Sequence, residues 1–333
     1  MKIGLTGDVM LGRLVDDEVI RNARLPPATV WGDVLPLLLE ADLRLVNLEC
    51  VISQCGQTWQ PEQKAFHFRA SPRAIEVLQA ARIDAVTLAN NHILDYGPEA
   101  LLECLTFLDR AGIQHTGAGR NLRDALTPML VECAENQVAV IALTDNEPAW
   151  EASEHQPGVN HVAYDRHGLL EPYRTRMAEV ISLARRHAQF IIISAHVGLN
   201  WGPPSPAMRA LAHHLLDLGA DLYWGHSNHT PQGIELYQGK AILYSTGDFI
   251  DDYAVDPTER NDLSFLFLLD IQDGHLQDLH LHPVRIENCR VGIVTDHDAA
   301  HLERHMQAKC AAFGSTLAFQ DHVGVMAVGQ DSS

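Results

Sequence analysis

Short apolar runs alternate with amphipathic stretches over the first two-thirds of this chain. The apolar runs predict six buried strands, at residues 3–6, 44–47, 85–88, 138–143, 190–194 and 221–224. The stretches between them carry apolar residues at helical spacing and predict helices at residues 72–81, 98–111, 172–187 and 206–218. Each of these helices starts at a proline, which is favoured in the first helical turn. Such an alternation is typical of a parallel sheet with helical crossovers.

After His229 the pattern becomes that of antiparallel strands. Residues 233–237 and 241–245 flank Gln238-Gly239-Lys240, and residues 263–270 and 275–284 flank Gln272-Asp273-Gly274. A glycine between two strand-like runs is a hairpin signal. A last helix is predicted at residues 299–312, and the polar tail at 324–333 is expected to be frayed.

The chain carries no low-complexity linker and no internal repeat, so we expect one domain. Its main part is assigned to residues 1–290, and residues 291–333 are expected to form a C-terminal helix and tail that pack on it. The expected fold class is α/β, with central mixed β-sheets flanked by helices.

Composition narrows the classes of function. The 333 residues are 46% hydrophobic and 20% charged, and the 24 basic residues against 43 acidic ones give a formal net charge of −19. This balance argues against binding to nucleic acid or to an anionic membrane, but it permits a small anionic substrate beside a bound metal. Neither a signal peptide nor a membrane-spanning run is recognisable, so we expect a cytoplasmic protein with reduced cysteines, which could form a homo-oligomer.

Metal-ligand residue types follow five of the six predicted strands. These residues are Asp8, Glu49, Asn91 with His92, His196, and His226 with His229. Each alone has an ordinary explanation, such as a turn, a helix cap or a buried histidine. In open α/β sheets, however, ligands bind beyond the carboxyl ends of the strands, where all of these residues are expected. Carboxylate, amide and imidazole groups together suit one or two divalent transition metals such as Mn, Fe or Zn.

The amino-acid sequences of these segments resemble those of the CapA family of poly-γ-glutamate capsule synthesis proteins. The resemblance covers roughly residues 2–290 and is carried by segments such as Gly7-Asp8-Val9-Met10-Leu11-Gly12, Asn47-Leu48-Glu49, Asn90-Asn91-His92 and Gly225-His226-Ser227-Asn228-His229. It implies a calcineurin-like metallophosphoesterase fold, an α+β four-layer sandwich. It also implies that the metal ligands are Asp8, Glu49, Asn91, His196, His226 and His229, and that His92 stabilises charge or donates a proton.

Two positions depart from the pattern of many relatives. Met10 stands where many calcineurin-like enzymes have a histidine, and Ser227-Asn228-His229 stands where many CapA relatives read His-Pro-His. These departures leave the number of bound metals open.

Three further residues have two interpretations each. Asp95 either orients His92 or caps the helix that begins near Pro98. Lys64 and Arg69 flank residues that alternate in polarity as in a strand, and they either bind a substrate phosphate or carboxylate or form a solvated strand face.

The leading hypothesis is a metal-dependent hydrolase. A metal-activated water would attack a phosphoester or a glutamyl-type amide of a small anionic substrate, and His92 with Asp95 would assist the leaving group. One alternative is a factor in the synthesis or release of a poly-γ-glutamate capsule. Another, motivated by Met10, is a non-catalytic metal-binding module.

Overall fold

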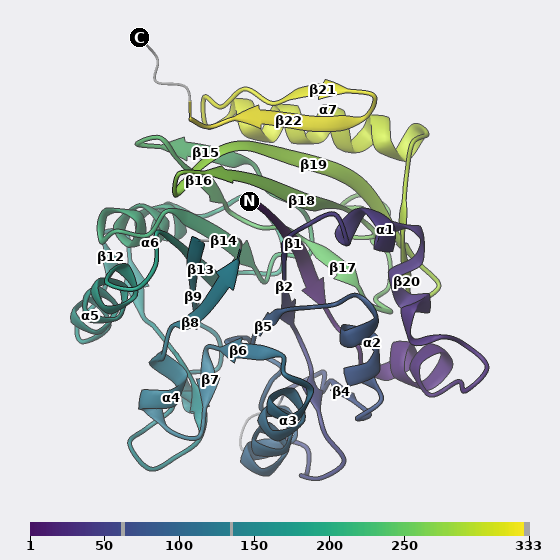
Figure 1. The fold of residues 1–333 in the computed structure, drawn as a ribbon, viewed down its shortest axis with the longest axis vertical. Coiled ribbons are helices and arrows are strands. Elements are labelled where there is room, and N and C mark those ends of the chain that lie inside the picture. Colours follow the sequence, from purple (N-terminus) through teal and green to yellow (C-terminus); the bar gives the residue numbers. More distant parts are fainter. Residues whose placement is uncertain (61–63, 134–135, 330–333) are drawn as a thin grey trace.

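Two β-sheets packed face to face form the centre of the molecule, with helices outside them (Figure 1). The structure is a computed structural model, and it describes residues 1–60, 64–133 and 136–329. The predicted class, a mixed α/β protein with central mixed sheets and flanking helices, is confirmed.

The larger sheet has ten strands, with the main order β21-β22-β19-β18-β1-β2-β5-β6 and with β17 beside β1 and β20 beside β19. Strands β1, β2, β5 and β6 are parallel to one another, whereas β18 to β22 add antiparallel neighbours. The strands are β1 (Lys2–Val9), β2 (Leu43–Leu48), β5 (Ala85–Thr87), β6 (Gln114–Thr116), β17 (Asp248–Ile250), β18 (Leu263–Gln272), β19 (His275–Glu287), β20 (Arg290–Ile293), β21 (Ala318–Gln320) and β22 (Val323–Ala327).

The smaller sheet has six strands in the order β15-β16-β14-β13-β9-β8. Its four inner strands are parallel, and β8 and β15 close it with antiparallel edges. The strands are β8 (Met129–Cys133), β9 (Asn136–Thr144), β13 (Phe190–His196), β14 (Leu222–His226), β15 (Ile234–Tyr237) and β16 (Lys240–Leu243).

The remaining elements connect and cover these sheets. Three two-stranded ladders are β3 (Val51–Ile52) with β4 (Arg69–Ala70), β7 (Ala118–Gly119) with β10 (Gly158–Val159), and β11 (Tyr164–Asp165) with β12 (Gly168–Leu169). The α-helices are α1 (Leu35–Leu38), α2 (Ala74–Ala80), α3 (Gly97–Ala111), α4 (Leu122–Leu126), α5 (Tyr173–Arg185), α6 (Pro206–Asp217) and α7 (His297–Ala311). Short π- and 3-10-helical segments span Val15–Ile20, Pro27–Val34 and Pro148–Trp150.

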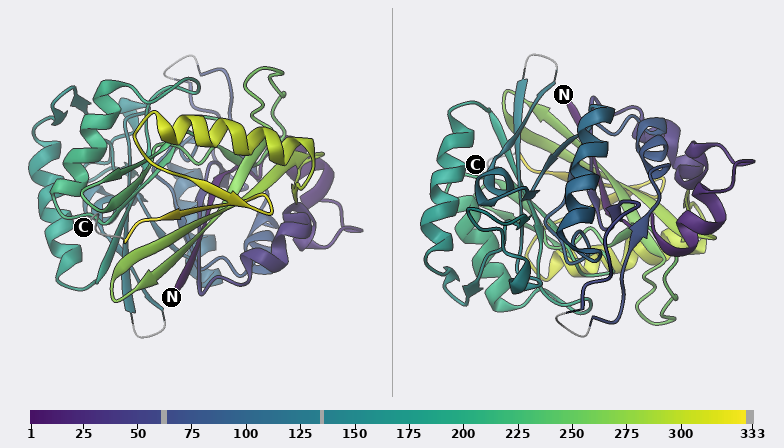
Figure 2. Two further views of the ribbon diagram at one scale, coloured as in Figure 1. Left: turned by 90° about the horizontal axis from the view of Figure 1, so that it is seen from above. Right: turned by 90° about the horizontal axis from the view of Figure 1, so that it is seen from below.

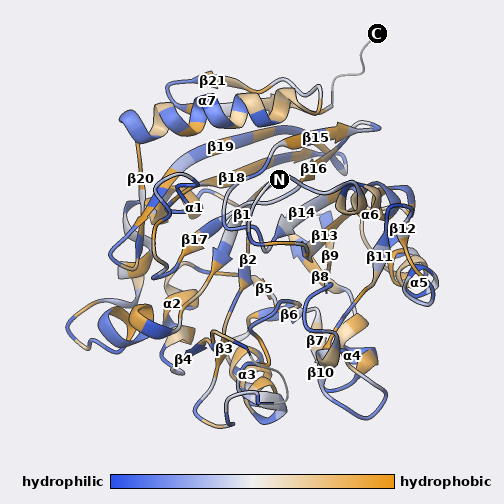
Figure 3. Cartoon of the chain, turned by 180° about the vertical axis from the view of Figure 1, so that it is seen from behind, coloured by the Kyte–Doolittle hydropathy of each residue, from blue (hydrophilic) through white to orange (hydrophobic). Residues whose placement is uncertain are grey.

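Three apolar cores explain why the central strands read as continuous apolar runs. On β13, Phe190 and Ile192 face the core between the two sheets, while Ile191 and Ile193 face the core under α5 and α6. A third core lies between the larger sheet and α2 and α3. The helices of these outer layers lie on opposite sides of the molecule (Figure 2) and carry both hydrophilic and hydrophobic residues (Figure 3). Strands buried on both faces need apolar residues at every position, which is the pattern of the sequence.

The predicted strands and the long helices are confirmed, with small shifts at their ends. Strands β1, β13 and β14 run on to Val9, His196 and His226, so three of the predicted ligands are the last residues of strands or close to it. The prediction of a frayed tail is wrong for residues 324–327, because β22 pairs with β19 and buries Met326. Residues 330–333 lie outside the described part.

The predicted division at residue 290 stays a prediction. Strands β20 to β22 extend the same sheet as β1, and α7 contributes Leu302 and Met306 to the core between the sheets. Within the described residues, no helix is both long enough and apolar enough to cross a membrane.

Glycines let the backbone approach closely just before Asp8 and His226. A Cβ on Gly7 would lie 2.2 Å from the carbonyl oxygen of Gly247, and a Cβ on Gly225 would lie 2.2 Å from that of Tyr244. Neither contact can be relieved by a side-chain rotation, because the opposing atoms belong to the backbone. Both glycines are therefore needed for strands to pair where the polar residues begin.

We expect Gly7→Ala and Gly225→Ala each to lower the free energy of unfolding by about 2–3 kcal/mol, as overpacking of a core does. Urea denaturation would measure the change. Gly292→Ala is the matched control, because a Cβ there meets only the Asp33 side chain at 3.4 Å. Equal stability of the three variants would refute this explanation of the two glycines.

Candidate metal centre

The carboxyl ends of strands from both sheets meet at one place. In the larger sheet Asp8 is in register with Asn47 on β2 and with Asp248 on β17. In the smaller sheet His196 is in register with His226. The sheets are joined here by a hydrogen bond from Trp224 Nε1 to the carbonyl oxygen of Thr6, at 3.1 Å. Polar side chains at these strand ends are thereby brought together, as the sequence predicts.

The side chains of Asp8, Glu49 and His196, all of types that bind metals, lie close together and are called the tight group. One ligand atom from each lies within 4.8 Å of the others, and all three residues are at most 2% exposed. His196 Nδ1 is 3.8 Å from Asp8 Oδ2, and His196 Nε2 is 3.7 Å from Glu49 Oε1. The imidazole therefore lies between the two carboxylates at distances too long for hydrogen bonds and suitable for a shared cation.

Two further predicted ligands have polar atoms without hydrogen-bond partners. Among the described residues, the buried Oδ1 of Asn91 and both ring nitrogens of His226 accept or donate no hydrogen bond. His226 Nδ1 nevertheless lies 2.7 Å from Asp8 Oδ1, a short contact that lacks hydrogen-bond geometry. Buried polar atoms are nearly always paired, so these orphaned atoms fit a group that binds them. The donor set of carboxylate, amide and imidazole is that of a transition metal.

His229 is positioned by a carboxylate. Its Nδ1 lies 2.9 Å from Asp248 Oδ1, which fixes the ring and leaves Nε2 available. Carboxylate partners of this kind commonly orient metal-binding histidines. Asp248 is paired with Asp8 through the backbone of β17 and β1, and its side chain contacts His229.

Asn47 is a member of the centre that the sequence interpretation missed. Its amide donates to Asp8 Oδ1 at 2.8 Å and lies 3.3 Å from His196 Nδ1. Its own Oδ1 accepts hydrogen bonds from Thr87 and Asn90. The available signal was an asparagine near the end of a mostly apolar strand, two residues before Glu49.

His92 and Asp95 form a hydrogen-bonded pair beside the tight group. His92 Nδ1 is 2.6 Å from Asp95 Oδ2, and His92 Nε2 is 4.0 Å from Glu49 Oε1. The first residue before α3 is Tyr96, and no side chain caps that helix. Of the two interpretations of Asp95, orientation of His92 is the one with a contact in the structure.

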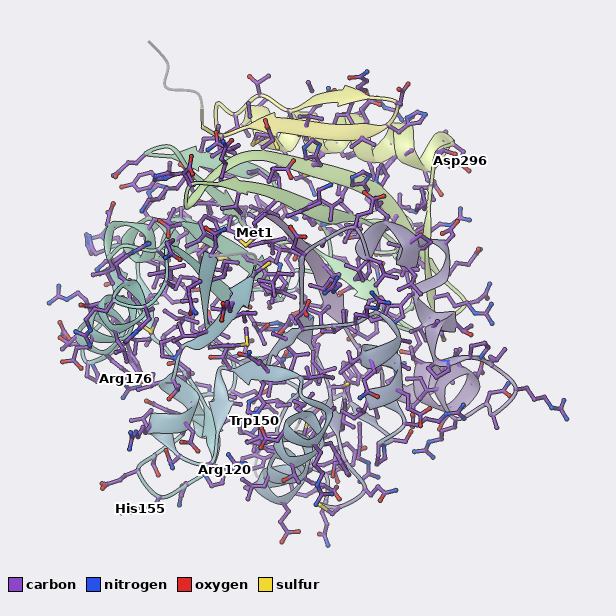
Figure 4. The ribbon with its side chains drawn as sticks, in the orientation of Figure 1. Met1, Arg120, Trp150, His155, Arg176 and Asp296 are labelled. Carbon is purple, nitrogen blue, oxygen red and sulfur yellow. The ribbon has the colours of Figure 1, made fainter. Side chains whose placement is uncertain are left out.

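Lys64 and Arg69 both have intramolecular partners. Lys64 Nζ donates to Asp95 Oδ1 at 2.6 Å and lies 4.4 Å from the ring centre of Trp150, which Figure 4 labels. The guanidinium of Arg69 lies 4.1 Å above the ring of Tyr96, and its Nη1 donates to the carbonyl oxygen of Cys55 at 3.4 Å. Of the alternating stretch that contains both residues, only Arg69 belongs to a strand.

The two departures from the family pattern have local explanations. Met10 is buried, and its sulfur accepts a hydrogen bond from the Gly12 amide at 3.1 Å. Ser227 has φ 80°, and its amide donates to Asp8 Oδ2 at 3.3 Å. Ser227 thus supports Asp8 through its backbone, a contact that does not require an imidazole.

Burial sets the protonation states of the centre. It raises the pKa of Glu49 well above its usual value, and the charge of Asp8 raises it further. Burial lowers the pKa of His92 to about 4 and that of His196 to about 3, so both rings are neutral near pH 7. Burial alone would raise the pKa of Asp8, but neighbouring His226 and His196 bring it below the usual range. The proton that competes with a metal is therefore expected on Glu49.

Known proteins with similar sequences belong to the family that these motifs resemble. The family model described as bacterial capsule synthesis protein PGA_cap matches residues 2–253, which include every residue of the centre. A probable polyglutamine synthesis accessory protein of Mycobacterium tuberculosis is 31% identical over 351 residues, covering 93% of this chain and 91% of that protein. The capsule biosynthesis protein CapA of Bacillus anthracis is 28% identical over 286 residues, covering 85% and 67%. The PGA biosynthesis protein CapA of Bacillus subtilis is 26% identical over 255 residues, covering 76% and 63%.

Metal addition should stabilise the protein more as the pH rises from about 5 to about 8. In the metal-free protein the raised pKa of Glu49 favours the protonated carboxyl. The stability that protonated Glu49 contributes is fully present below the pKa of this carboxyl in the unfolded state. It is lost as the pH rises through the pKa in the folded state. A metal needs the deprotonated form and restores what is lost. Differential scanning fluorimetry with added Mn²⁺ or Zn²⁺ would measure the gain in Tm.

Glu49→Gln cannot ionise, so its gain in Tm should be smaller and should rise less with pH. Glu154→Gln is the control, because that carboxylate is exposed whereas the carboxylates of the centre are buried. A gain in the unsubstituted protein that stays constant over this pH range would contradict the assignment of the competing proton to Glu49.

Proposed function

This chain belongs to the bacterial capsule synthesis protein PGA_cap family, and on that premise we propose that it is a metal-dependent hydrolase. The substrate class we propose is a phosphoester or a glutamyl-type amide carried by a small anionic molecule. The layered sheets and helices are compatible with the four-layer sandwich of calcineurin-like metallophosphoesterases, which we propose as the detailed fold.

One observation carries the proposal: a buried triad of ligand types lies beside a histidine–carboxylate pair. The triad is Asp8, Glu49 and His196, and the pair is His92 and Asp95. In a purely structural metal site, protein ligands fill all coordination positions of the metal, and no histidine–carboxylate pair is needed beside it. The separate imidazole, directed at Glu49 and held from behind by a carboxylate, fits proton transfer at the edge of the centre.

The centre would hold one or two of Mn, Fe or Zn through Asp8, Glu49, Asn91, His196, His226 and His229. A bound divalent metal would supply Lewis acidity and would lower the pKa of a water molecule. The protein residues around it have three tasks. Asn47 holds Asp8 in place, Asp248 orients His229, and the surrounding apolar layers restrict water.

The protonation of His92 defines its part in the reaction. Asp95 also accepts a hydrogen bond from Lys64, so its carboxyl oxygens act as acceptors. We therefore place the hydrogen of the contact between His92 and Asp95 on His92 Nδ1. Because burial lowers the pKa of His92 to about 4, its Nε2 carries a lone pair near pH 7. His92 Nε2 would first accept a proton from the attacking water molecule, and Asp95 would stabilise the resulting imidazolium until the proton passes to the leaving group.

The names of the relatives favour a second proposal about biological role. They are called capsule, PGA or polyglutamine synthesis proteins, two of them CapA and one an accessory protein. We propose that a glutamyl-type amide links that role to the centre described above. Capsule synthesis or release would then depend on hydrolysis and not on a separate activity.

Asp95→Asn should lower kcat by about 10²–10⁴-fold while metal content stays unchanged, because it removes proton transfer and spares the ligands. Steady-state kinetics with phosphodiester, phosphomonoester and γ-glutamyl amide substrates would measure this, together with metal analysis. Asp109→Asn is the matched control, since it alters an exposed carboxylate that pairs with His115 away from the centre. A normal kcat in Asp95→Asn would exclude the proposed role of the pair.

Asp8→Asn separates catalysis from a structural metal. A catalytic centre predicts lost metal-dependent turnover in a variant that still folds, whereas a structural metal predicts a large loss of stability on metal removal. Circular dichroism and thermal unfolding of the unsubstituted protein with and without chelator would give the stability result. The absence of turnover of any ester or amide with Mn, Fe or Zn would overturn the hydrolase proposal.

A further inference from the structure

Arg13 is held firmly at the surface by contacts that leave the tip of its side chain free. Its backbone has φ 53°, a conformation that residues other than glycine rarely adopt. Its Nε lies 3.3 Å from Oδ2 of Asp252, whose side chain is 1% exposed. The guanidinium carbon lies 5.5 Å from the ring centre of Phe68 and 6.0 Å from that of Tyr253, within the range of cation–π attraction.

The two rings beneath Arg13 border the metal centre. Phe68 stacks on the imidazole of His92 with ring centres 3.8 Å apart. The hydroxyl of Tyr253 donates to Glu49 Oε2 at 3.4 Å, and its ring centre is 5.2 Å from that of His229. The two rings are themselves 5.6 Å apart. Arg13 is thus connected to His92 and Glu49 through a single aromatic layer.

The tip of Arg13 differs from the other cations near the centre. Lys64 is neutralised by Asp95, and Arg69 donates to a backbone carbonyl. Within the described residues, neither Nη group of Arg13 donates a hydrogen bond, and its side chain is 37% exposed. With Nε anchored at Asp252, the two Nη groups remain as a planar pair of free donors on a partly exposed side chain.

We propose that Arg13 binds a second anionic group of the substrate, a carboxylate or a phosphate, while the reacting group occupies the metal centre. The position of the reacting group rests on the proposed function, but the anion site itself does not. A planar guanidinium pre-oriented by packing binds such groups in a bidentate manner. In a chain of net charge −19, an anionic ligand needs a local cation that still has free donors, and the Nη groups of Arg13 provide them. Phe66, 60% exposed and 5.7 Å from the guanidinium, adds an apolar contact for the intervening part of the ligand.

Calorimetric titration of the metal-free protein tests this site without the metal centre as a competing anion site. The probes are inorganic phosphate and glutarate, so that the two anion chemistries are measured separately. Arg13→Ala should weaken binding of at least one probe by about 10-fold or more, and Arg13→Lys by a smaller factor, because an ammonium lacks the fork of donors. Arg24→Ala is the matched control, since it removes an exposed arginine whose side chain has no partner within the described residues.

Thermal unfolding of each variant would show that the fold is kept, and Arg13→Lys remains informative if Arg13→Ala is unstable. Loss of phosphate binding alone, or of glutarate binding alone, supports the site and identifies its ligand. Binding of neither probe to the unsubstituted protein at millimolar concentration, or unchanged binding in stable Arg13 variants, would overturn it. The protein could bind an anion through Arg13 and yet have no hydrolytic activity. That result would support the anion site and contradict only the hydrolase proposal.

Discussion

The contact between Asp8 and His226 joins two sheets at a position almost closed to water. The two residues come from β1 and β14, lie 2.7 Å apart and are at most 1% exposed. A buried carboxylate costs several kcal/mol unless charges and hydrogen bonds compensate for it. Here Asn47 and the amide of Ser227 supply part of that compensation. Glu49, buried in the same region with a raised pKa, shows that compensation by protein groups alone is incomplete.

A bound cation would compensate the buried carboxylates. Several features of the fold hold the side chains that would bind it in place. The glycines before Asp8 and His226 allow strands to pair where the polar residues begin. The hydrogen bond from Trp224 to Thr6 joins the sheets near that edge. Apolar cores pack against the sheets, so Asp8, His196 and His226 are positioned by strands, whereas Glu49, Asn91 and His229 lie shortly after them.

Much of this organisation could be predicted from the sequence because it depends on local patterns. Strands buried on both faces require unbroken apolar runs, and ligand residues at the ends of such runs converge by topology alone. Contacts between distant segments could not be predicted in this way. The partners of Lys64 and Arg69, the hydrogen bonds of Asn47 and the position of Tyr253 depend on how strands and loops that are distant in the sequence pack together. The terminal strand β22 was missed because its short run, Val323–Ala327, contains a glycine and leads into the end of the chain, although Gly324 and Met326 alternate as buried residues.

The central claim is that the orphaned polar atoms of Asn91 and His226, together with Asp8, Glu49 and His196, bind a transition metal. Anomalous diffraction from crystals grown with Mn²⁺ or Zn²⁺, recorded on both sides of the metal absorption edge, tests it most directly. The account predicts one or two anomalous peaks among these five side chains, with ligand distances of about 2.0–2.3 Å. A map without a peak there, in crystals that contain the metal and a correctly folded protein, would contradict it.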